Sequence, residues 1–88
     1  MYIKTEDYTI TYNKKCEYGG LISIWSISLT KYPEYWFIAQ LNEDGKEKGE
    51  VAFLYNTMYD EDKEYTYYID KLEHKIKNAI VFLSNNLI

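Results

Sequence analysis

Apolar and polar residues alternate along the first part of the chain, and this period-two pattern is typical of β-strands with one buried face. Within residues 2–12, Tyr8, Ile10 and Tyr12 share one side while threonines lie on the other. The polar residues 13–20 end in two glycines and predict a loop or turn. The pattern therefore predicts a first strand over residues 2–12, followed by a loop.

The second predicted strand covers residues 21–29, LISIWSISL, and its alternation changes phase part-way along. Ile22 and Ile24 fall on one face, whereas Trp25 and Leu29 fall on the other. A β-bulge near Ile24 would join the two halves, because one extra residue returns the side chains to the same face. Otherwise both faces of this strand are partly buried. The sequence leaves these two alternatives open.

A β-hairpin is predicted in the middle of the chain, from residues 34–42 and residues 50–55. Pro33 interrupts the preceding pattern, since proline lacks the backbone donor that a strand ladder needs. Asp44 and Gly45 lie between the two strands, and this dipeptide favours a hairpin because glycine tolerates positive φ. Large apolar residues occur on both faces of the hairpin. One helix can cover only one face, so the other is covered by something else or is exposed for binding.

The last third of the chain carries a helical pattern. Apolar residues recur there at spacings of three and four, so on the helical period they make one continuous stripe. We therefore expect one α+β domain over residues 1–88. Its fold is a four-stranded antiparallel meander followed by one long C-terminal helix packed on one face. The stripe consists of Tyr65, Tyr68, Ile69, Leu72, Ile76, Ala79, Ile80, Leu83 and Leu87.

Composition narrows the kind of partner. The 88 residues are 47% hydrophobic, which is enough for one core and too high for a disordered chain. Tyrosine supplies 11 residues, and its amphipathic side chain is enriched at recognition surfaces as well as in cores. The net charge is −4, and every basic residue is lysine. Proteins that bind nucleic acid usually show a basic patch with arginines, so direct nucleic-acid binding is not expected.

Neither the cysteine content nor the hydropathy suggests secretion or membrane insertion. Cys16 is the one cysteine and forms no internal disulfide, which favours a reducing compartment. The N-terminal residues 1–12 contain charges and lack the apolar segment of a signal peptide. No apolar run approaches the ~20 residues that a membrane span needs. We expect a soluble cytoplasmic protein without a membrane partner, acting in the host cytoplasm if a phage encodes it.

Residues 56–75 combine acidic residues with tyrosines, and three explanations compete for them. A calcium loop would use Asp60, Asp62 and Glu64 as its first, third and fifth positions. That loop then requires glycine at the next position and glutamate at its end, where this chain has tyrosine and lysine. We therefore expect no metal and no cofactor.

Initiation of the helix is the second explanation for these acids. Thr57 and Asp60 have the spacing of a capping box, and Asp60 is a suitable N-cap by itself. Acidic residues in the first turns and lysines further along the helix also complement its dipole. This explanation is structural and implies no partner.

A negatively charged recognition surface is the third explanation. If the fold brings the acids of the hairpin and of the helix start together, they would attract a basic groove on a partner protein. Lysines lie among the acids, so a mixed protein-binding face is favoured over close mimicry of a nucleic acid. The predicted partner-binding residues are Tyr59, Asp60, Asp62, Glu64 and Tyr67, with Glu43, Asp44 and Glu47 as steering charges.

A second line of residues lies on the helix face opposite the apolar stripe. Tyr67, His74 and Val81 recur every seven residues. Scattered apolar residues on an outer face are normal, but such a line is also suited to a dimer contact. A homodimer formed through this line, or through the spare face of the hairpin, is the alternative function. It would make the chain a structural or assembly domain.

Catalysis has little support in the sequence. A thiol enzyme would need Cys16 beside His74, together with an orienting group and an oxyanion hole. No phosphate-binding glycine loop, metal-ligand spacing or serine elbow occurs in the chain. We therefore expect no enzymatic activity.

The chain combines two acidic stretches, EDGKEKGE and YDEDKEY, with tyrosine-rich strands. This combination, together with its small size, is the basis of a resemblance. The chain resembles the small acidic inhibitors that phages and mobile elements direct against host defence proteins, including anti-CRISPR proteins. The resemblance implies a non-catalytic module that blocks a host defence or nucleic-acid-processing protein through an acidic, tyrosine-rich surface. No motif accompanies it, so it assigns no role to a particular residue.

Overall fold

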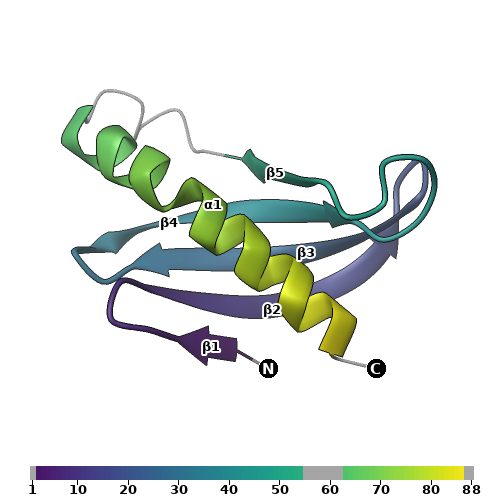
Figure 1. The fold of residues 1–88 in the computed structure, drawn as a ribbon, viewed down its shortest axis with the longest axis horizontal. Helices are drawn as coiled ribbons and strands as arrows, with labels where there is room; N and C mark the ends of the chain where they lie inside the picture. Colours follow the sequence, from purple (N-terminus) through teal and green to yellow (C-terminus); the bar gives the residue numbers. More distant parts are fainter. Residues whose placement is uncertain (1, 55–62, 87–88) are drawn as a thin grey trace.

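The computed structural model describes residues 2–54 and 63–86, which form an antiparallel sheet with one helix across it (Figure 1). The strands lie in sequence order, each antiparallel to the next. The predicted α+β meander with a C-terminal helix on one face is confirmed, with five strands in place of four. The elements are β1 (Tyr2–Lys4), β2 (Tyr8–Glu17), β3 (Leu21–Leu29), β4 (Tyr32–Asn42), β5 (Val51–Leu54) and α1 (Lys63–Asn86).

The additional strand arises because the predicted first strand turns back on itself. β1 ends at Lys4, and Thr5 then begins a tight turn into β2. The Thr5 Oγ1 accepts hydrogen bonds from the backbone N–H groups of Asp7 and Tyr8, each at 3.2 Å. The Thr5 N–H donates to the Tyr8 carbonyl at 2.8 Å. A threonine that bonds the neighbouring backbone in this way favours a turn over a continuous strand.

A β-bulge lies opposite Trp25 and Ile24, but its extra residue belongs to β2 and not to the predicted strand 21–29. The register passes from the pair Tyr12–Trp25 to the pair Lys14–Ile24, which leaves Asn13 as the extra residue. Its Nδ2 donates a hydrogen bond of 2.7 Å to the Oγ of a serine in β3. The irregularity therefore belongs to the polar strand, and β3 alternates without interruption.

The predicted loop over residues 13–20 is wrong in its first part, because β2 continues to Glu17. β3 offers this polar segment a full set of partners, with Cys16 opposite Ile22. Pairing with a neighbouring strand outweighs the weak strand preference of these residues.

β3 divides its side chains between the two faces of the sheet. Trp25, Ile27 and Leu29 face the helix and are fully buried. Ser23 shares this face, and its Oγ accepts a hydrogen bond from the Trp25 indole N–H at 2.8 Å. Ile24 points to the opposite face and is half-buried. Of the two alternatives for this strand, partial burial of both faces is therefore the one that the structure supports.

The predicted hairpin is present as β4 and β5, joined by loop 43–50. Gly45 has a φ of 78°, which is the left-handed conformation that the turn prediction required. Pro33 lies inside β4 rather than before it, between Tyr32 and Trp36, where the register with β3 is irregular. Its missing N–H therefore removes no regular ladder bond.

The hydrophobic core lies between α1 and one face of the sheet. The helix contributes the predicted stripe, in which Tyr65, Ile69, Leu72, Ile76 and Ile80 are buried. In the part of the chain that the structure describes, α1 is the only helix, so the opposite face of the sheet has no covering layer. The buried core residues of the strands are Tyr8, Ile10, Trp25, Ile27, Leu29, Phe37, Ala39 and Leu41.

Candidate functional site

The residues predicted at the helix start are only partly described. Tyr59, Asp60 and Asp62 lie outside the described residues. Glu64 and Tyr67 lie in the first turns of α1 and are exposed, with 64% of Tyr67 accessible to solvent. Their side chains are therefore available to a partner.

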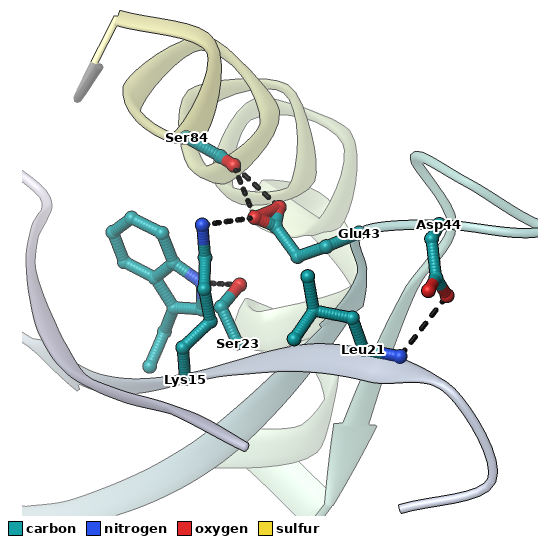
Figure 2. Close-up of polar contacts among 7 residues, drawn as sticks. Lys15, Leu21, Ser23, Glu43, Asp44 and Ser84 are labelled. Atoms are coloured by element: carbon teal, nitrogen blue, oxygen red, sulfur yellow. Dashed lines mark hydrogen bonds and ion pairs between the residues drawn. The ribbon is translucent and has the colours of Figure 1, made fainter. Parts of the chain in front are cut away.

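Glu43 is largely buried in a polar cluster at the other end of the helix (Figure 2). Its carboxylate accepts a hydrogen bond of 2.5 Å from the Ser84 Oγ and lies 3.5 Å from the Lys15 Nζ. Only 12% of the Glu43 side chain is exposed. The cluster joins the last turn of α1 to β2 and to the end of β4. Because the Glu43 carboxylate is buried and paired with a lysine, it attracts a distant partner only weakly.

Asp44 and Glu47 border a cleft between the β2–β3 turn and loop 43–50. The Asp44 Oδ1 accepts a hydrogen bond from the backbone N–H of Leu21 at 3.0 Å (Figure 2). The cleft has a volume of about 260 Å³ and is bordered on one side by Tyr18, which is 85% exposed. Lys46 lies between the two acids in the loop, so the charge of this rim is mixed.

The described acids do not converge on one surface. Ser84, which binds Glu43, lies near the end of α1, whereas Glu64 lies in its first turn. About 20 residues of helix separate them, a distance of about 30 Å at the helical rise. Figure 1 shows loop 43–50 at one end of the molecule and the first turns of α1 at the other. A basic partner would therefore meet two separate acidic groups.

The first turns of α1 and the β3–β4 turn enclose a second concave site, which we call the tyrosine cleft. Its volume is about 260 Å³. Two lysines lie against its rings: the Lys31 Nζ is 5.2 Å from the centroid of Tyr68, and the Lys71 Nζ is 5.1 Å from that of Tyr67. Cation–π attraction holds both ammonium groups at its walls. The tyrosine cleft is lined by Lys31, Tyr32, Glu64, Tyr67, Tyr68 and Lys71.

The fold raises the pKa of Tyr68, one of the residues that line this cleft. Desolvation raises the pKa of its phenol, and the nearby Asp7 carboxylate raises it further by charge and by accepting a hydrogen bond. A phenol beside a carboxylate keeps its proton because two adjacent negative charges repel. The Tyr68 hydroxyl therefore keeps its proton and donates a hydrogen bond to the Asp7 carboxylate.

The three residues of the predicted dimer seam differ in their surroundings. Tyr67 and His74 are exposed on the outer side of α1. Val81 is half-buried and packs against the hydrophobic core. Phe82, the next residue, is 63% exposed. The line therefore offers a second copy two polar-tipped rings, while Val81 is already used within the fold.

Cys16 and His74 lie on opposite sides of the sheet. Lys15 reaches Glu43 on the helix side, and successive side chains of a strand point to opposite faces, so Cys16 points away from the helix. His74 belongs to α1 on the other side. The described residues therefore do not bring the two groups of a thiol–imidazole pair together.

The uncovered side of the sheet, which we call the open face, is the feature that sequence reasoning did not resolve. Two rows of paired residues cross it. In one row, Thr9 pairs with Ser28 and Ser28 with Trp36. The other row runs Tyr2, Thr11, Ser26, Ile38 and Leu54 from β1 to β5. Residues that pair in a sheet share a face, so the register places these side chains on one surface.

The two halves of the open face differ in relief. On β4 and β5, Trp36, Ile38 and Leu54 form an apolar ridge, with Trp36 56% and Leu54 46% exposed. On β2 and β3, the row partners are short hydroxyl side chains. This hydroxyl strip lies between the ridge and Tyr2 on β1, and the Asn13 Nδ2 donates a hydrogen bond to Ser26 within it. It consists of Thr9, Thr11, Ser26 and Ser28.

The open face carries no charge over β3, over β4 from Trp36 to Asn42, or over β5. Lys4 and Lys14 are the charged side chains at its β1–β2 margin. A sheet face left in water normally carries charged or strongly polar groups. In this chain 27% of the residues are charged, so the exclusion of charge from this area is specific to it. The uncharged positions are Ile22, Ile24, Ser26, Ser28, Trp36, Ile38, Gln40, Asn42, Ala52 and Leu54.

Within residues 2–54 and 63–86, no group of three or more His, Cys, Asp or Glu residues is placed to hold a metal ion. The helix of these residues lacks the apolar length of a membrane span. Comparisons with protein-family models, curated proteins and solved structures found no match for this chain.

Proposed function

We propose that this chain is a non-catalytic protein-binding module whose binding surface is the open face of its sheet. The observation that carries the proposal is the exposed Trp36, which lies with Leu54 on a surface without charge. Exposed tryptophan is rare on surfaces that remain in water, and tryptophan is the residue most enriched among interface hot spots.

The composition of the open face supports the same proposal. The centres of protein interfaces are depleted in charged residues and enriched in aromatic residues, while their margins are polar. Here Trp36 and Ile38 lie inside the uncharged area, and Lys4 and Lys14 lie at its margin. Burial of the exposed apolar surface supplies about 25 cal/mol for each Å² removed from water.

The chemistry of the open face defines the partner that it fits. A surface without charge gives no attraction to an acidic or a basic groove. Its partner therefore presents an uncharged surface with apolar groups. Such binding resists high salt, because apolar contacts are not screened by ions.

Affinity capture tests this function. Tagged protein is exposed to nuclease-treated lysate of a plausible host, washed at low and at high salt, and its partners are identified by mass spectrometry. We expect a partner that stays bound at high salt and is lost when Trp36→Ala replaces the wild-type protein. Phe82→Ala is the matched control, since it removes another exposed aromatic side chain from the opposite layer of the fold. Equal capture by Trp36→Ala and the wild type would contradict the proposal.

The inhibitor role predicted from composition concerns the identity of the partner. It requires a host defence or nucleic-acid-processing protein with a basic groove. Among the predicted acids within residues 2–54 and 63–86, the exposed ones are Glu64 at one end and Asp44 and Glu47 at the other. The same capture experiment distinguishes such an inhibitor from a module that binds through the open face. A partner held by those charges is lost at high salt and is unaffected by Trp36→Ala.

A further inference from the structure

We propose that the partner of the open face is a second copy of this chain, so that two sheets stack face to face about a two-fold axis. This inference rests on the proposed function, since it names the occupant of the same surface. Three properties of the open face carry it: its neutrality, its division into an apolar ridge and a hydroxyl strip, and its area.

The lack of charge on the open face permits self-association there. The chain has a net charge of −4, so two copies repel each other wherever their acids meet. The open face is free of charge over β3, over β4 from Trp36 to Asn42, and over β5, and the acids of loop 43–50 and of α1 lie outside it. Glu34, which is exposed two residues before Trp36, lies at its margin where the register with β3 is irregular. Face-to-face stacking therefore creates no pair of like charges in the contact area. Lys4 and Lys14 stay at the margin, where water screens them.

The relief of the open face is complementary to itself. The apolar ridge lies on β4 and β5, and the hydroxyl strip lies on β2 and β3. A two-fold axis through the middle of the face places the ridge of each copy over the strip of the other. Trp36 then packs against short side chains such as Thr9 and Ser28. Their hydroxyls are suitable acceptors for its indole N–H, as the Ser23 hydroxyl is for Trp25 within one copy.

The area of the open face matches the smallest stable interfaces. β2, β3 and β4 have 10, 9 and 11 residues, and β1 and β5 are shorter. At ~3.3 Å per residue and ~4.8 Å between strands, the sheet covers roughly 600 Å². Specific interfaces begin at about 1,200 Å² in total, which is about 600 Å² from each copy. The dimer is therefore expected to dissociate on dilution.

The oligomeric state of the purified protein tests the inference. Light scattering and sedimentation equilibrium from about 1 μM to about 1 mM are expected to show a monomer converting to a dimer. Trp36 gives a second readout, because it is exposed in one copy while Trp25 is fully buried. Its emission shifts to shorter wavelength and its quenching by acrylamide falls as the dimer forms. Trp25 emission reports that each variant is folded.

Single substitutions locate the contact. Trp36→Ala is expected to weaken the dimer by about tenfold or more, as loss of a hot-spot aromatic does. Ser28→Glu is expected to do the same, because it places a charge under the ridge of the other copy. The matched controls are Phe82→Ala and Asn78→Glu, which change exposed residues of α1 on the other side of the sheet and are expected to leave dissociation unchanged.

A mixing experiment tests the two-fold arrangement of ridge and strip. The two-fold dimer contains two equivalent contacts, each between Trp36 of one copy and Ser28 of the other. When a Trp36→Ala chain pairs with a Ser28→Glu chain, both substitutions fall in the same contact. The second contact then keeps the wild-type Trp36 and the wild-type Ser28. The mixture is therefore expected to dimerise more tightly than either variant alone. Affinity no higher than that of the better single variant would overturn this arrangement.

The results separate this inference from the proposed function. A chain that stays monomeric to about 1 mM, with Trp36 fully quenchable throughout, would overturn self-association. The proposed function would survive that result if a foreign partner still requires Trp36 for capture. A dimer that Trp36→Ala and Ser28→Glu leave intact would overturn the open face as its contact surface.

Discussion

The Glu43 cluster illustrates what single residues decide in this fold. Ser84 occupies a buried position of the helix stripe, where its hydroxyl binds Glu43 while Lys15 approaches the same carboxylate. Partnering of this kind is required because a buried carboxylate without donors costs several kcal/mol. One polar residue in an apolar stripe thus sets where the last turn of α1 meets the sheet.

Replacing Ser84 with alanine is expected to lower the free energy of unfolding by about 1–3 kcal/mol, since it leaves Glu43 short of a donor. That is a large share of the roughly 4–13 kcal/mol expected for a chain of this length. Urea denaturation measures the loss. Asn85→Ala is the matched control, because it removes an exposed polar side chain from the next helix position. Equal effects from both variants would show that the hydrogen bond adds nothing.

The raised pKa of Tyr68 predicts a dependence of stability on pH. Because the folded pKa lies above the unfolded one, this contribution is complete below the unfolded pKa of about 10 and is lost as pH rises through the folded value. The wild type is therefore expected to lose stability relative to Tyr68→Phe above about pH 10. Denaturation at several pH values measures this difference, with Tyr67→Phe as the control variant. A difference that is independent of pH would contradict the prediction.

At the scale of elements, the helix was predictable because its stripe repeats over many turns. The strands were less so: a threonine turn divides the first, and a bulge at Asn13 shifts the register of β2. Both are local events that depend on backbone hydrogen bonds. The alternation of apolar residues predicts them poorly, since it indicates which face a side chain lies on and not which residue of the neighbouring strand it pairs with.

Contact between α1 and the sheet is expected to carry much of the stability. Ile76→Ala creates a cavity at a fully buried position and is expected to cost about 2–5 kcal/mol. Phe82→Ala removes a larger side chain from the same helix, but this residue is 63% exposed and the expected loss is under about 1 kcal/mol. Chemical denaturation of the two variants compares them. A greater loss for Phe82→Ala would mean that the helix packs on a different face.

At the scale of the whole molecule, the distribution of charge limits how it meets a partner. The acids of loop 43–50 and Glu64 are separated by nearly the whole length of α1. This distance of about 30 Å is several times the Debye length of about 8 Å at physiological salt. The two groups therefore act on an approaching partner as independent charges.

For a partner with a basic groove, the effects of Glu47→Lys and Glu64→Lys on the association rate are expected to multiply in the double variant. Charges separated by more than a Debye length are screened from each other, so neither substitution alters the effect of the other. Stopped-flow association at physiological salt measures the three rates. A double variant much slower or faster than the product would show that the partner joins both ends in one contact.

The tertiary structure also separated residues that composition had grouped. Glu43, Asp44 and Glu47 look alike in the sequence, yet Glu43 is buried against Ser84 and the other two are exposed. Similarly, Val81 follows the spacing of Tyr67 and His74 but packs on the core. Burial depends on how elements pack together, which residue type and spacing along one element do not specify.

The sequence by itself determined the class of fold, the order of its elements and the helix stripe, because each follows from periodicity within one segment. It also indicated that the hairpin has two apolar faces. Only the tertiary structure decided which face α1 covers, since that requires the register between strands that are distant in sequence. That register leaves Trp36 exposed beside Leu54 on an uncharged surface, and the proposed binding function depends on this placement.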